Sequence, residues 1–251
     1  FTSSGTEANQ TVIRSAVVGL GSHQPCEQLA QGAIIGATEH SASLDLIEIL
    51  DHALPFVRTL PVLSNGQYDL NALEILLNEA HADDLNRVFL SIGWANNETG
   101  VLQDIQALQA VLARSPVQVL LHLDGAQVWG KTPINLTETG ADYVTFSAHK
   151  IGAPAGVGLI WRKKSAPFSS LIPGSQQHGQ RGGTENSLGM VAMGIAAQHL
   201  DANAFSKHTT ALRDRLEKKL KELVYPVKIW GEDTARIGNT SRIGLMGFKK
   251  Y

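Results

Sequence analysis

Residues 117–150, VQVLLHLDGAQVWGKTPINLTETGADYVTFSAHK, contain two apolar runs that each end in polar side chains. The first run, Val117–Asp124, is almost wholly apolar, which predicts a central parallel strand buried on both faces. The second run, Asp142–Ser147, predicts another strand, and Ser-Ala-His-Lys occupies 147–150 at its end. Because reactive residues of a parallel sheet lie just beyond the carboxyl ends of its strands, both polar ends are candidates for one site.

Strand and helix patterns alternate on both sides of this stretch, up to about residue 165. The periodicity of apolar residues predicts strands at 32–37, 56–60, 87–93 and 156–162, and helices at 6–20, 41–53, 69–80 and 105–114. Such alternation implies an α/β fold of three layers, with a mostly parallel mixed sheet and helices on both faces. Two further strand ends are polar, Glu39-His40 and Asn96-Asn97-Glu98.

The pattern changes after residue 184. An Ala/Gly/Met-rich helix is expected over 184–200, followed by a long amphipathic helix over 201–224 whose basic face is solvated. Further strand candidates are 227–230 and 243–248. We therefore expect a large domain over 1–200, and a connecting helix with the start of an incomplete smaller domain over 201–251.

Composition excludes several classes of protein. The 251 residues include 21 basic and 23 acidic ones. This balance lacks the excess of positive charge that is typical of proteins that bind nucleic acid or an anionic membrane surface. The one cysteine, Cys26, excludes an internal disulfide framework and a Cys-cluster metal site. No apolar run approaches the ~18 residues of a membrane span. We expect a protein of a reducing, cytoplasmic compartment, for which no leader segment is visible in the sequence.

Two features suit the binding of a phosphorylated aldehyde. Small residues at 3–6 open the first helix, where free amides and the helix dipole can hold a phosphate. Taken alone, they are explained more simply by an ordinary N-cap. Lys150 is followed by a Gly- and Pro-containing loop and can form a Schiff base if its ammonium is desolvated or flanked by positive charge. The alternative for Lys150 is an ordinary surface lysine.

Polar residues at the other strand ends suit the ring of the same ligand. Asp124 can pair with a protonated pyridine nitrogen, and Gln127 can bind a phenolic oxygen. Asn97 can donate to that oxygen or to a substrate carboxylate, and His40 can stack on a planar ring. Each residue also has an ordinary structural explanation: Asp124 can cap a helix, and Gln127 can lie on the surface. Asn97 can belong to a plain turn, and His40 can be a structural histidine. Together these groups match pyridoxal 5′-phosphate (PLP), and no one alternative explains them all.

The sequence resembles the cysteine desulfurases, within the class-V aminotransferase group of fold-type-I PLP-dependent enzymes. The resemblance runs over nearly the whole chain and is carried by six motifs in order: FTSSGTEAN (1–9), TEH (38–40), NNETGV (96–101), HLDGAQ (122–127), SAHK (147–150) and GQRGGTEN (179–186). These motifs are more specific to the family than to one substrate. Gly125, where alanine is common, and Gln177-His178, where an acidic-basic pair is common, depart from the family pattern.

The resemblance implies a role for each candidate around the cofactor ring. Lys150 forms the internal aldimine, and Asp124 pairs with the pyridine nitrogen. Gln127 binds the ring oxygen, and Asn97 helps to orient substrate and cofactor. His40 stacks on the ring and assists proton transfer, so that Lys150 and His40 are the implied catalytic residues.

The phosphate has its own implied set of residues. Gly5, Thr6, Ser147 and His149 hold it within one subunit. Thr184, after Arg-Gly-Gly, reaches the phosphate of a partner subunit, so the resemblance implies a homodimer.

The activity implied by the resemblance converts L-cysteine to L-alanine. The sulfur passes to an enzyme cysteine as a persulfide, and then to an acceptor or scaffold protein in iron–sulfur cluster or thiolation pathways. In the family this cysteine and the arginine that clamps the substrate carboxylate lie downstream of the position of Tyr251, and Cys26 is expected to be an incidental thiol. The 251 residues alone are therefore expected to be inactive.

Two other functions stay open at this point. One is a selenocysteine lyase or another class-V aminotransferase-like enzyme. The other is an inactive fragment or paralogue that acts as a dimerisation or binding module.

Overall fold

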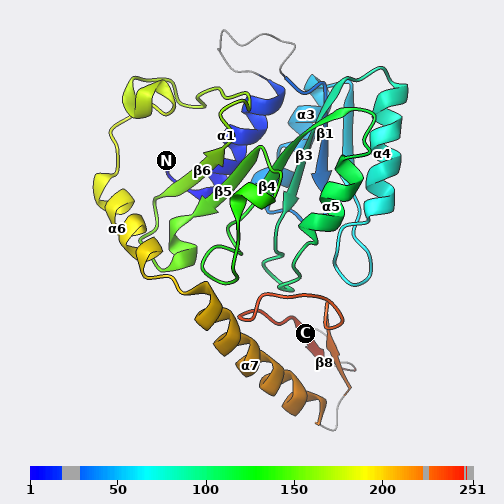
Figure 1. Ribbon diagram of the computed structural model, residues 1–251, viewed down its shortest axis with the longest axis vertical. Helices are drawn as coiled ribbons and strands as arrows, with labels where there is room; N and C mark the ends of the chain where they lie inside the picture. Colours follow the sequence, from blue (N-terminus) through cyan, green and yellow to red (C-terminus); the bar gives the residue numbers. More distant parts are fainter. Residues whose placement is uncertain (19–28, 223–225, 246, 248–251) are drawn as a thin grey trace.

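The computed structural model describes residues 1–18, 29–222, 226–245 and 247. Cys26 and the end of the predicted strand 243–248 lie outside these residues. Figure 1 shows a central sheet with helices packed on its faces, and a long helix, α7 (Ala202–Lys221), that leads away from it to a small pair of strands. Among the described helices, none has the length and apolar character needed to cross a membrane.

Six strands form the main sheet in the order β2-β1-β3-β4-β5-β6. Their bounds are Gly32–Gly36 for β1, Phe56–Leu60 for β2, Arg87–Gly93 for β3, Gln118–Asp124 for β4, Tyr143–Ser147 for β5 and Gly158–Arg162 for β6. Neighbouring strands from β2 to β5 pair in parallel, whereas β6 is antiparallel to β5. The predicted mostly parallel mixed sheet is confirmed.

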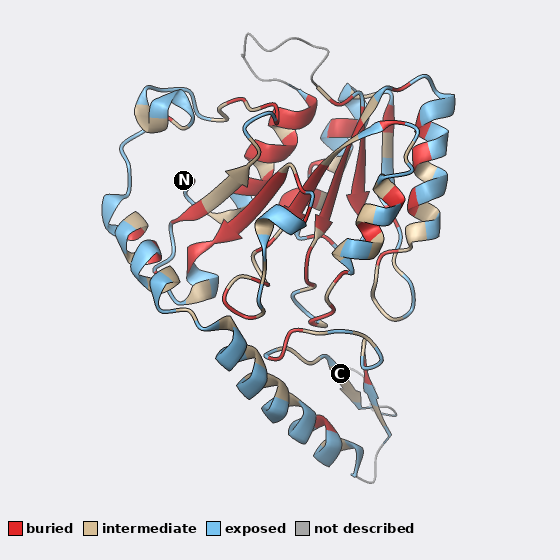
Figure 2. Cartoon of the chain, viewed as in Figure 1, coloured by how far each residue is buried: buried red, intermediate tan, exposed pale blue. Residues whose placement is uncertain are grey.

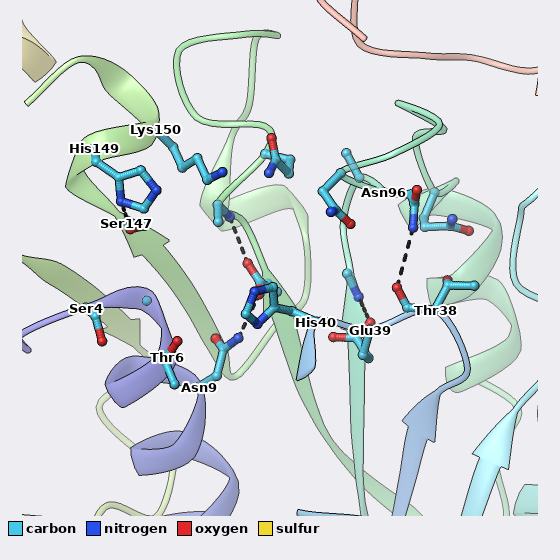
Figure 3. Close-up of a pocket in the computed structure, with 18 of the residues that line it drawn as sticks. Ser4, Thr6, Asn9, Thr38, Glu39, His40, Asn96, Ser147, His149 and Lys150 are labelled. Carbon is cyan, nitrogen blue, oxygen red and sulfur yellow. Dashed lines mark hydrogen bonds between the residues drawn. The ribbon is translucent and has the colours of Figure 1, made fainter. Parts of the chain in front are cut away.

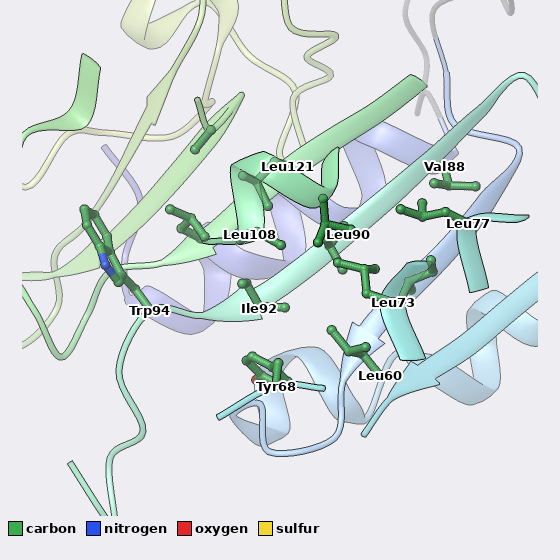
Figure 4. Close-up of a cluster of buried hydrophobic side chains, with 14 of the residues drawn as sticks. Leu60, Tyr68, Leu73, Leu77, Val88, Leu90, Ile92, Trp94, Leu108 and Leu121 are labelled. Carbon is green, nitrogen blue, oxygen red and sulfur yellow. The ribbon is translucent and has the colours of Figure 1, made fainter. Parts of the chain in front are cut away.

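Helices cover both faces because strand side chains alternate between two apolar clusters. Ile34 of β1 packs with the cluster that includes α4 (Leu70–Ala82) and α5 (Ile105–Leu112), as do the residues labelled in Figure 4. Ala33 and Ile35 face the other cluster, which includes α1 (Gly5–Val17) and α3 (Ile47–Ala53). The strands are consequently the most buried part of the molecule (Figure 2), and the three layers agree with the prediction.

The predicted helix over 41–53 is wrong in one respect, because it is two helices. α2 (Ser41–Leu44) ends before a turn at Asp45, and α3 begins at Ile47. The amide of Leu46 bonds to the carbonyl of Ser43, one residue closer than in an α-helix, and this tighter turn interrupts the regular pattern. The turn keeps Leu46 buried beside the apolar cluster of α1.

The strand at 117–124 also differs from its prediction. Leu121 and Leu123 are fully enclosed, but Val119 and Leu120 are only partly buried. These two residues line an open groove beside Ala166 and Pro167 at the end of the sheet opposite the polar strand ends. An apolar sequence therefore predicted the strand correctly and overestimated the burial of its first half.

Helix α6 (Ser187–Gln198) begins three residues later than predicted, because Asn186 caps it by accepting a hydrogen bond from the amide of Gly189. Beyond α7, strands β7 (Val227–Ile229) and β8 (Ile243–Leu245) form a separate antiparallel pair. The segment between them is fixed to the large sheet unit by the amide of Ile237, which donates to the carbonyl of Gly100 at 2.8 Å. The division into domains at residue 200 stays a prediction.

Candidate active site

A cavity of about 240 Å³ lies at the carboxyl ends of the parallel strands. It is lined by every predicted site residue except Thr184: Gly5, Thr6, His40, Asn97, Asp124, Gln127, Ser147, His149 and Lys150. Figure 3 shows Lys150 and His149 on one side, Ser4 and Thr6 on another, and His40 near the middle. Residues from five separate segments of the chain thus meet in one place, as the rule for parallel sheets predicts.

The start of α1 forms one wall of the cavity. Ser4 caps the helix, and its hydroxyl accepts a hydrogen bond from the amide of Glu7 at 3.1 Å. The amides of Gly5 and Thr6 have no acceptor in the described part of the chain, as first-turn amides lack an intrahelical partner. A Cβ atom on Gly5 would lie 3.2 Å from Cβ of Ser147, so glycine lets the helix approach β5 closely. Free first-turn amides at a helix N-terminus are suited to an anion, and the predicted phosphate site at this wall stays a prediction.

Ser147 and His149 face that helix end from β5 and the 3₁₀ turn Ala148–Ile151. The Ser147 hydroxyl and His149 Nδ1 lie 2.9 Å apart and share a hydrogen bond. Burial, and then the charges of Lys150 and Lys131, lower the pKa of His149, so its ring is neutral at neutral pH. Ser147 and His149, both predicted to hold a phosphate, thus form one hydrogen-bonded unit, and Nε2 of His149 stays available to a ligand. Their binding of a phosphate stays a prediction.

Lys150 occupies the same 3₁₀ turn, which ends at Gly152 with φ of 87°. This left-handed conformation favours glycine and turns the chain sharply after the lysine. The Lys150 side chain is exposed to the cavity and forms no hydrogen bond or ion pair with the described residues. Its amine is therefore accessible to a ligand.

Lys131 does not line the cavity, but it contacts the lining residue Gln127, and no role for it was predicted from the sequence. Its side chain is 7% exposed, and burial together with the charge of Lys150 lowers its pKa to about 8. Its Nζ donates to Oε1 of Gln127. Because an ammonium only donates, the Gln127 amide group must present its Nε2 hydrogens elsewhere. Lys131 thus places a positive charge near Lys150, and it sets the orientation of Gln127.

Asp124 is held by two neutral amides. Its Oδ2 accepts from Nδ2 of Asn9 at 2.7 Å, and its Oδ1 accepts from the backbone amide of Ala126 at 2.9 Å. Ionised carboxylates offer about four acceptor positions, so both oxygens retain capacity for a further donor. Asn9 ends the first of the six motifs, and no role for it was predicted from the sequence. Its position three and four residues before Val12 and Ile13, on the buried face of α1, is the signal that could have identified it.

Glu39 is a second carboxyl group at the cavity. Its Oε1 accepts from the hydroxyl of Tyr68 at 2.7 Å and from the amide of Gly93. Its Oε2 is buried without a hydrogen-bond partner in the described structure. Burial, and then the charge of Asp124, raise the pKa of Glu39 to about 8. The carboxyl is therefore protonated at neutral pH, and since Oε1 already accepts two bonds, the proton belongs on Oε2.

His40 and Asn97 have the freedom that their predicted roles require. The Nδ1 atom of His40 caps α2 by accepting from the amide of Ala42 at 3.0 Å, which leaves Nε2 as the ring atom that can donate a hydrogen bond. Asn97 is exposed at the cavity and makes no hydrogen bond within the described residues. Its neighbour Asn96 instead accepts from the amides of Glu98 and Thr99 and builds the turn.

Thr184 is exposed and does not line the cavity. Its segment is fixed nearby, because Arg181 binds both carboxylate oxygens of Glu7 at 2.9 and 3.1 Å. The role of Thr184 in a partner subunit stays a prediction. In the described structure no group of three or more His, Cys, Asp or Glu side chains is placed to hold a metal ion.

Comparison with known proteins identifies the family of this chain. The sequence model described as Aminotransferase class-V matches residues 1–245. The chain belongs to the class-V aminotransferases. It is 37% identical to a cysteine desulfurase of Cereibacter sphaeroides over 98% of its own length and 60% of that protein. It is 34% identical to the cysteine desulfurase NifS of Azotobacter vinelandii, over 98% of its length and 58% of that protein.

Solved structures agree with this class-V aminotransferase assignment. The X-ray structure of a NifS-like protein from Rickettsia africae superposes with a TM-score of 0.82 at 30% identity, covering 96% of this chain and 61% of that one. The predicted fold class and family resemblance are therefore confirmed. The chain spans about three fifths of the length of the Cereibacter and Azotobacter cysteine desulfurases.

Proposed function

We propose that the chain is the cofactor-binding part of a PLP-dependent cysteine desulfurase. The observation that carries the proposal is the convergence of an accessible lysine amine, an acceptor carboxylate, an oriented amide and a helix N-terminus on one cavity. The similarity to cysteine desulfurases over 98% of the chain supports the substrate class.

The groups that face the cavity fit PLP one by one. The free amides of Gly5 and Thr6 suit a phosphate, and the amine of Lys150 suits an aldehyde. The spare acceptor positions of Asp124 suit a protonated ring nitrogen, and the Nε2 hydrogens of Gln127 suit a phenolic oxygen. Bound there, PLP would supply an electron sink for charge that develops on the α-carbon of an amino acid.

The chain's own residues would then move protons. The amine of Lys150, which lies near the charge of Lys131, takes the proton from the α-carbon of L-cysteine. The Nε2 atom of His40 faces the cavity with its proton, because Nδ1 is occupied by the amide of Ala42. His40 is therefore oriented to donate that proton. Asn97 is exposed at the cavity without a hydrogen bond to the described residues, and we assign it to orient the substrate.

The proposed overall reaction transfers sulfur. An enzyme thiolate attacks the substrate sulfur, the carbon–sulfur bond breaks, a sulfur–sulfur bond forms, and the β-carbon gains a proton to give L-alanine. We assign the thiolate and an arginine for the substrate carboxylate to positions outside residues 1–251, since the relatives are longer than the matched part. The persulfide then supplies iron–sulfur cluster or thiolation pathways through an acceptor protein.

A homodimer is part of the same proposal. Helix α6 exposes Leu188, Val191 and Ile195, whose spacing of three and four residues places them on one face. The exposed fractions of their side chains are 87%, 61% and 53%. An apolar stripe of this kind, directly after Thr184, supports a subunit contact there.

The test is to locate the covalent bond to PLP. After incubation with PLP and reduction with borohydride, peptide mapping is expected to find the label on Lys150. Lys131, a second amine near Lys150, is the internal control and is expected to stay unlabelled because it is buried and bonded to Gln127. Label on Lys131, or label spread over exposed lysines, would refute the proposed site.

Lys131→Met should weaken PLP binding about tenfold, the value of a charge-assisted hydrogen bond of roughly 1.4 kcal/mol. Methionine keeps the buried apolar stem, but it removes the donor that holds Oε1 of Gln127 and the charge next to Lys150. Fluorescence titration with PLP measures the effect. Lys163→Met is the matched control, because that lysine pairs with Asp142 away from the cavity. Equal affinities in the two variants would contradict the role given to Lys131.

A further inference from the structure

A continuous chain of buried hydrogen bonds, which we call the row, leads from Ser91 in the core of the sheet to Asp124. Ser91 Oγ lies 2.9 Å from Nδ1 of His122, and Nε2 of His122 lies 3.0 Å from Oγ1 of Thr145. The Thr145 hydroxyl bonds to Oδ1 of Asn9, and Nδ2 of Asn9 donates to Oδ2 of Asp124 at 2.7 Å. The four side chains before Asp124 are each at most 2% exposed. They come from β3, β4, β5 and α1.

The direction of the row follows from what each group can donate. Asp124 accepts, so Asn9 must turn its Nδ2 towards it and its Oδ1 towards Thr145. An amide oxygen only accepts, so the one hydroxyl hydrogen of Thr145 is used on Asn9. Thr145 must therefore accept from Nε2–H of His122.

The His122 ring is neutral, and this determines the direction of its hydrogen bond with Ser91. Burial lowers its pKa to about 3, and the ring stacks on Phe89 with centroids 6.1 Å apart. The ring's hydrogen-bond partners are Ser91 from β3 and Thr145 from β5, both uncharged, and the nearest carboxylate in the row, Asp124, is two bonds beyond Thr145. A neutral ring with its proton on Nε2 has Nδ1 as an acceptor, so Ser91 donates to it.

We propose that Ser91, His122 and Thr145 are positioning residues that fix the amide of Asn9, so that every donor in the row points towards Asp124. Their effect is to exclude the flipped amide, which would bring Oδ1 of Asn9 against the carboxylate of Asp124. Asp124 is then held with its spare acceptor positions open to the cavity. The consequence for a bound ring nitrogen rests on the proposed function, whereas the direction of the row does not.

The first test is made on the wild-type chain without PLP, and a variant serves only to assign its signals. In the chain labelled with 15N-histidine, the ring nitrogens of His122 are expected to show a proton on Nε2 and none on Nδ1, unchanged between about pH 5 and pH 8. Comparison with the spectrum of His122→Gln assigns the signals. A proton on Nδ1, or titration of the ring in this range, overturns the proposal.

The second test breaks the row at its centre with Thr145→Val, which keeps the shape and removes the hydroxyl. His122 then loses the acceptor of its Nε2–H, and its proton is expected to move to Nδ1, where Ser91 can accept it. The affinity for PLP is expected to fall about tenfold because Asn9 is no longer fixed. An unchanged tautomer and an unchanged PLP affinity in Thr145→Val overturn the proposal.

Thr11→Val is the matched control, since Thr11 is also buried and its hydroxyl bonds within α1 to the carbonyl of Glu7. It should leave the tautomer of His122 unchanged and PLP affinity within about twofold. A drop in Thr11→Val equal to that of Thr145→Val overturns the proposal, because any lost buried hydroxyl would then suffice. Failure of the wild-type chain to bind PLP, with the expected tautomer present, refutes the proposed function and leaves the direction of the row established.

Discussion

Lys150→Ala is expected to abolish the visible absorption band that the chain acquires with PLP, and to leave no label after borohydride reduction. The reason is that, of the lysine amines in the described structure, that of Lys150 lines the cavity, whereas the amine of Lys131 is buried and donates to Gln127. The fold should tolerate the change, because the exposed Lys150 side chain has no partner among the described residues. Its effect on the free energy of unfolding is expected within about 0.5 kcal/mol.

Absorbance spectroscopy and mass spectrometry of the reduced protein measure the result. Lys164→Ala serves as the control, because it removes an exposed lysine that does not line the cavity, and it should keep both the band and the label. A Lys150→Ala protein that retains the band, with label transferred to Lys131, would show that the assignment of the two lysines is wrong.

The parts of the site found from sequence are those at the ends of predictable strands. An apolar run followed by Asp124, and another followed by Ser147 to Lys150, predict both the strand and the place of its polar end. Because parallel strands bring all such ends to one edge, the sequence also predicted that Asp124 and Lys150 would share a cavity. This prediction needed only local patterns and one rule of topology.

The partners that tune these residues depend on contacts that no local pattern encodes. Tyr68 precedes α4 and is 29 residues from Glu39, yet its hydroxyl bonds to that carboxyl group. Lys131 lies in the irregular segment after β4, where no periodicity predicts which way a side chain points. The split between α2 and α3 likewise follows from one tightened turn, which apolar spacing does not reveal.

Relative to the wild type, Glu39→Gln is expected to gain stability as pH rises from about 4.5 to about 8, and to keep that gain above pH 8. Glu39 has a pKa of about 8 in the folded protein and an ordinary value of 4.5. Between these values the unfolded chain has lost the proton that the folded chain retains. The wild-type free energy of unfolding therefore falls relative to the variant, by about 1.4 kcal/mol per pH unit across this window. Glutamine resembles the protonated acid, because its Oε1 can still accept from Tyr68 and Gly93.

Urea unfolding of both proteins at several values between about pH 5 and pH 9 measures this difference. The lowered pKa of His122 has the opposite sign: its contribution to stability increases as pH rises from about 3 towards 6.5. That contribution is common to both proteins and cancels in the comparison. Glu48→Gln, which changes an exposed carboxyl on α3, should follow the wild type at a constant offset. A constant offset for Glu39→Gln as well would mean that Glu39 is ionised in the folded protein, and its Oε2 would then need a donor.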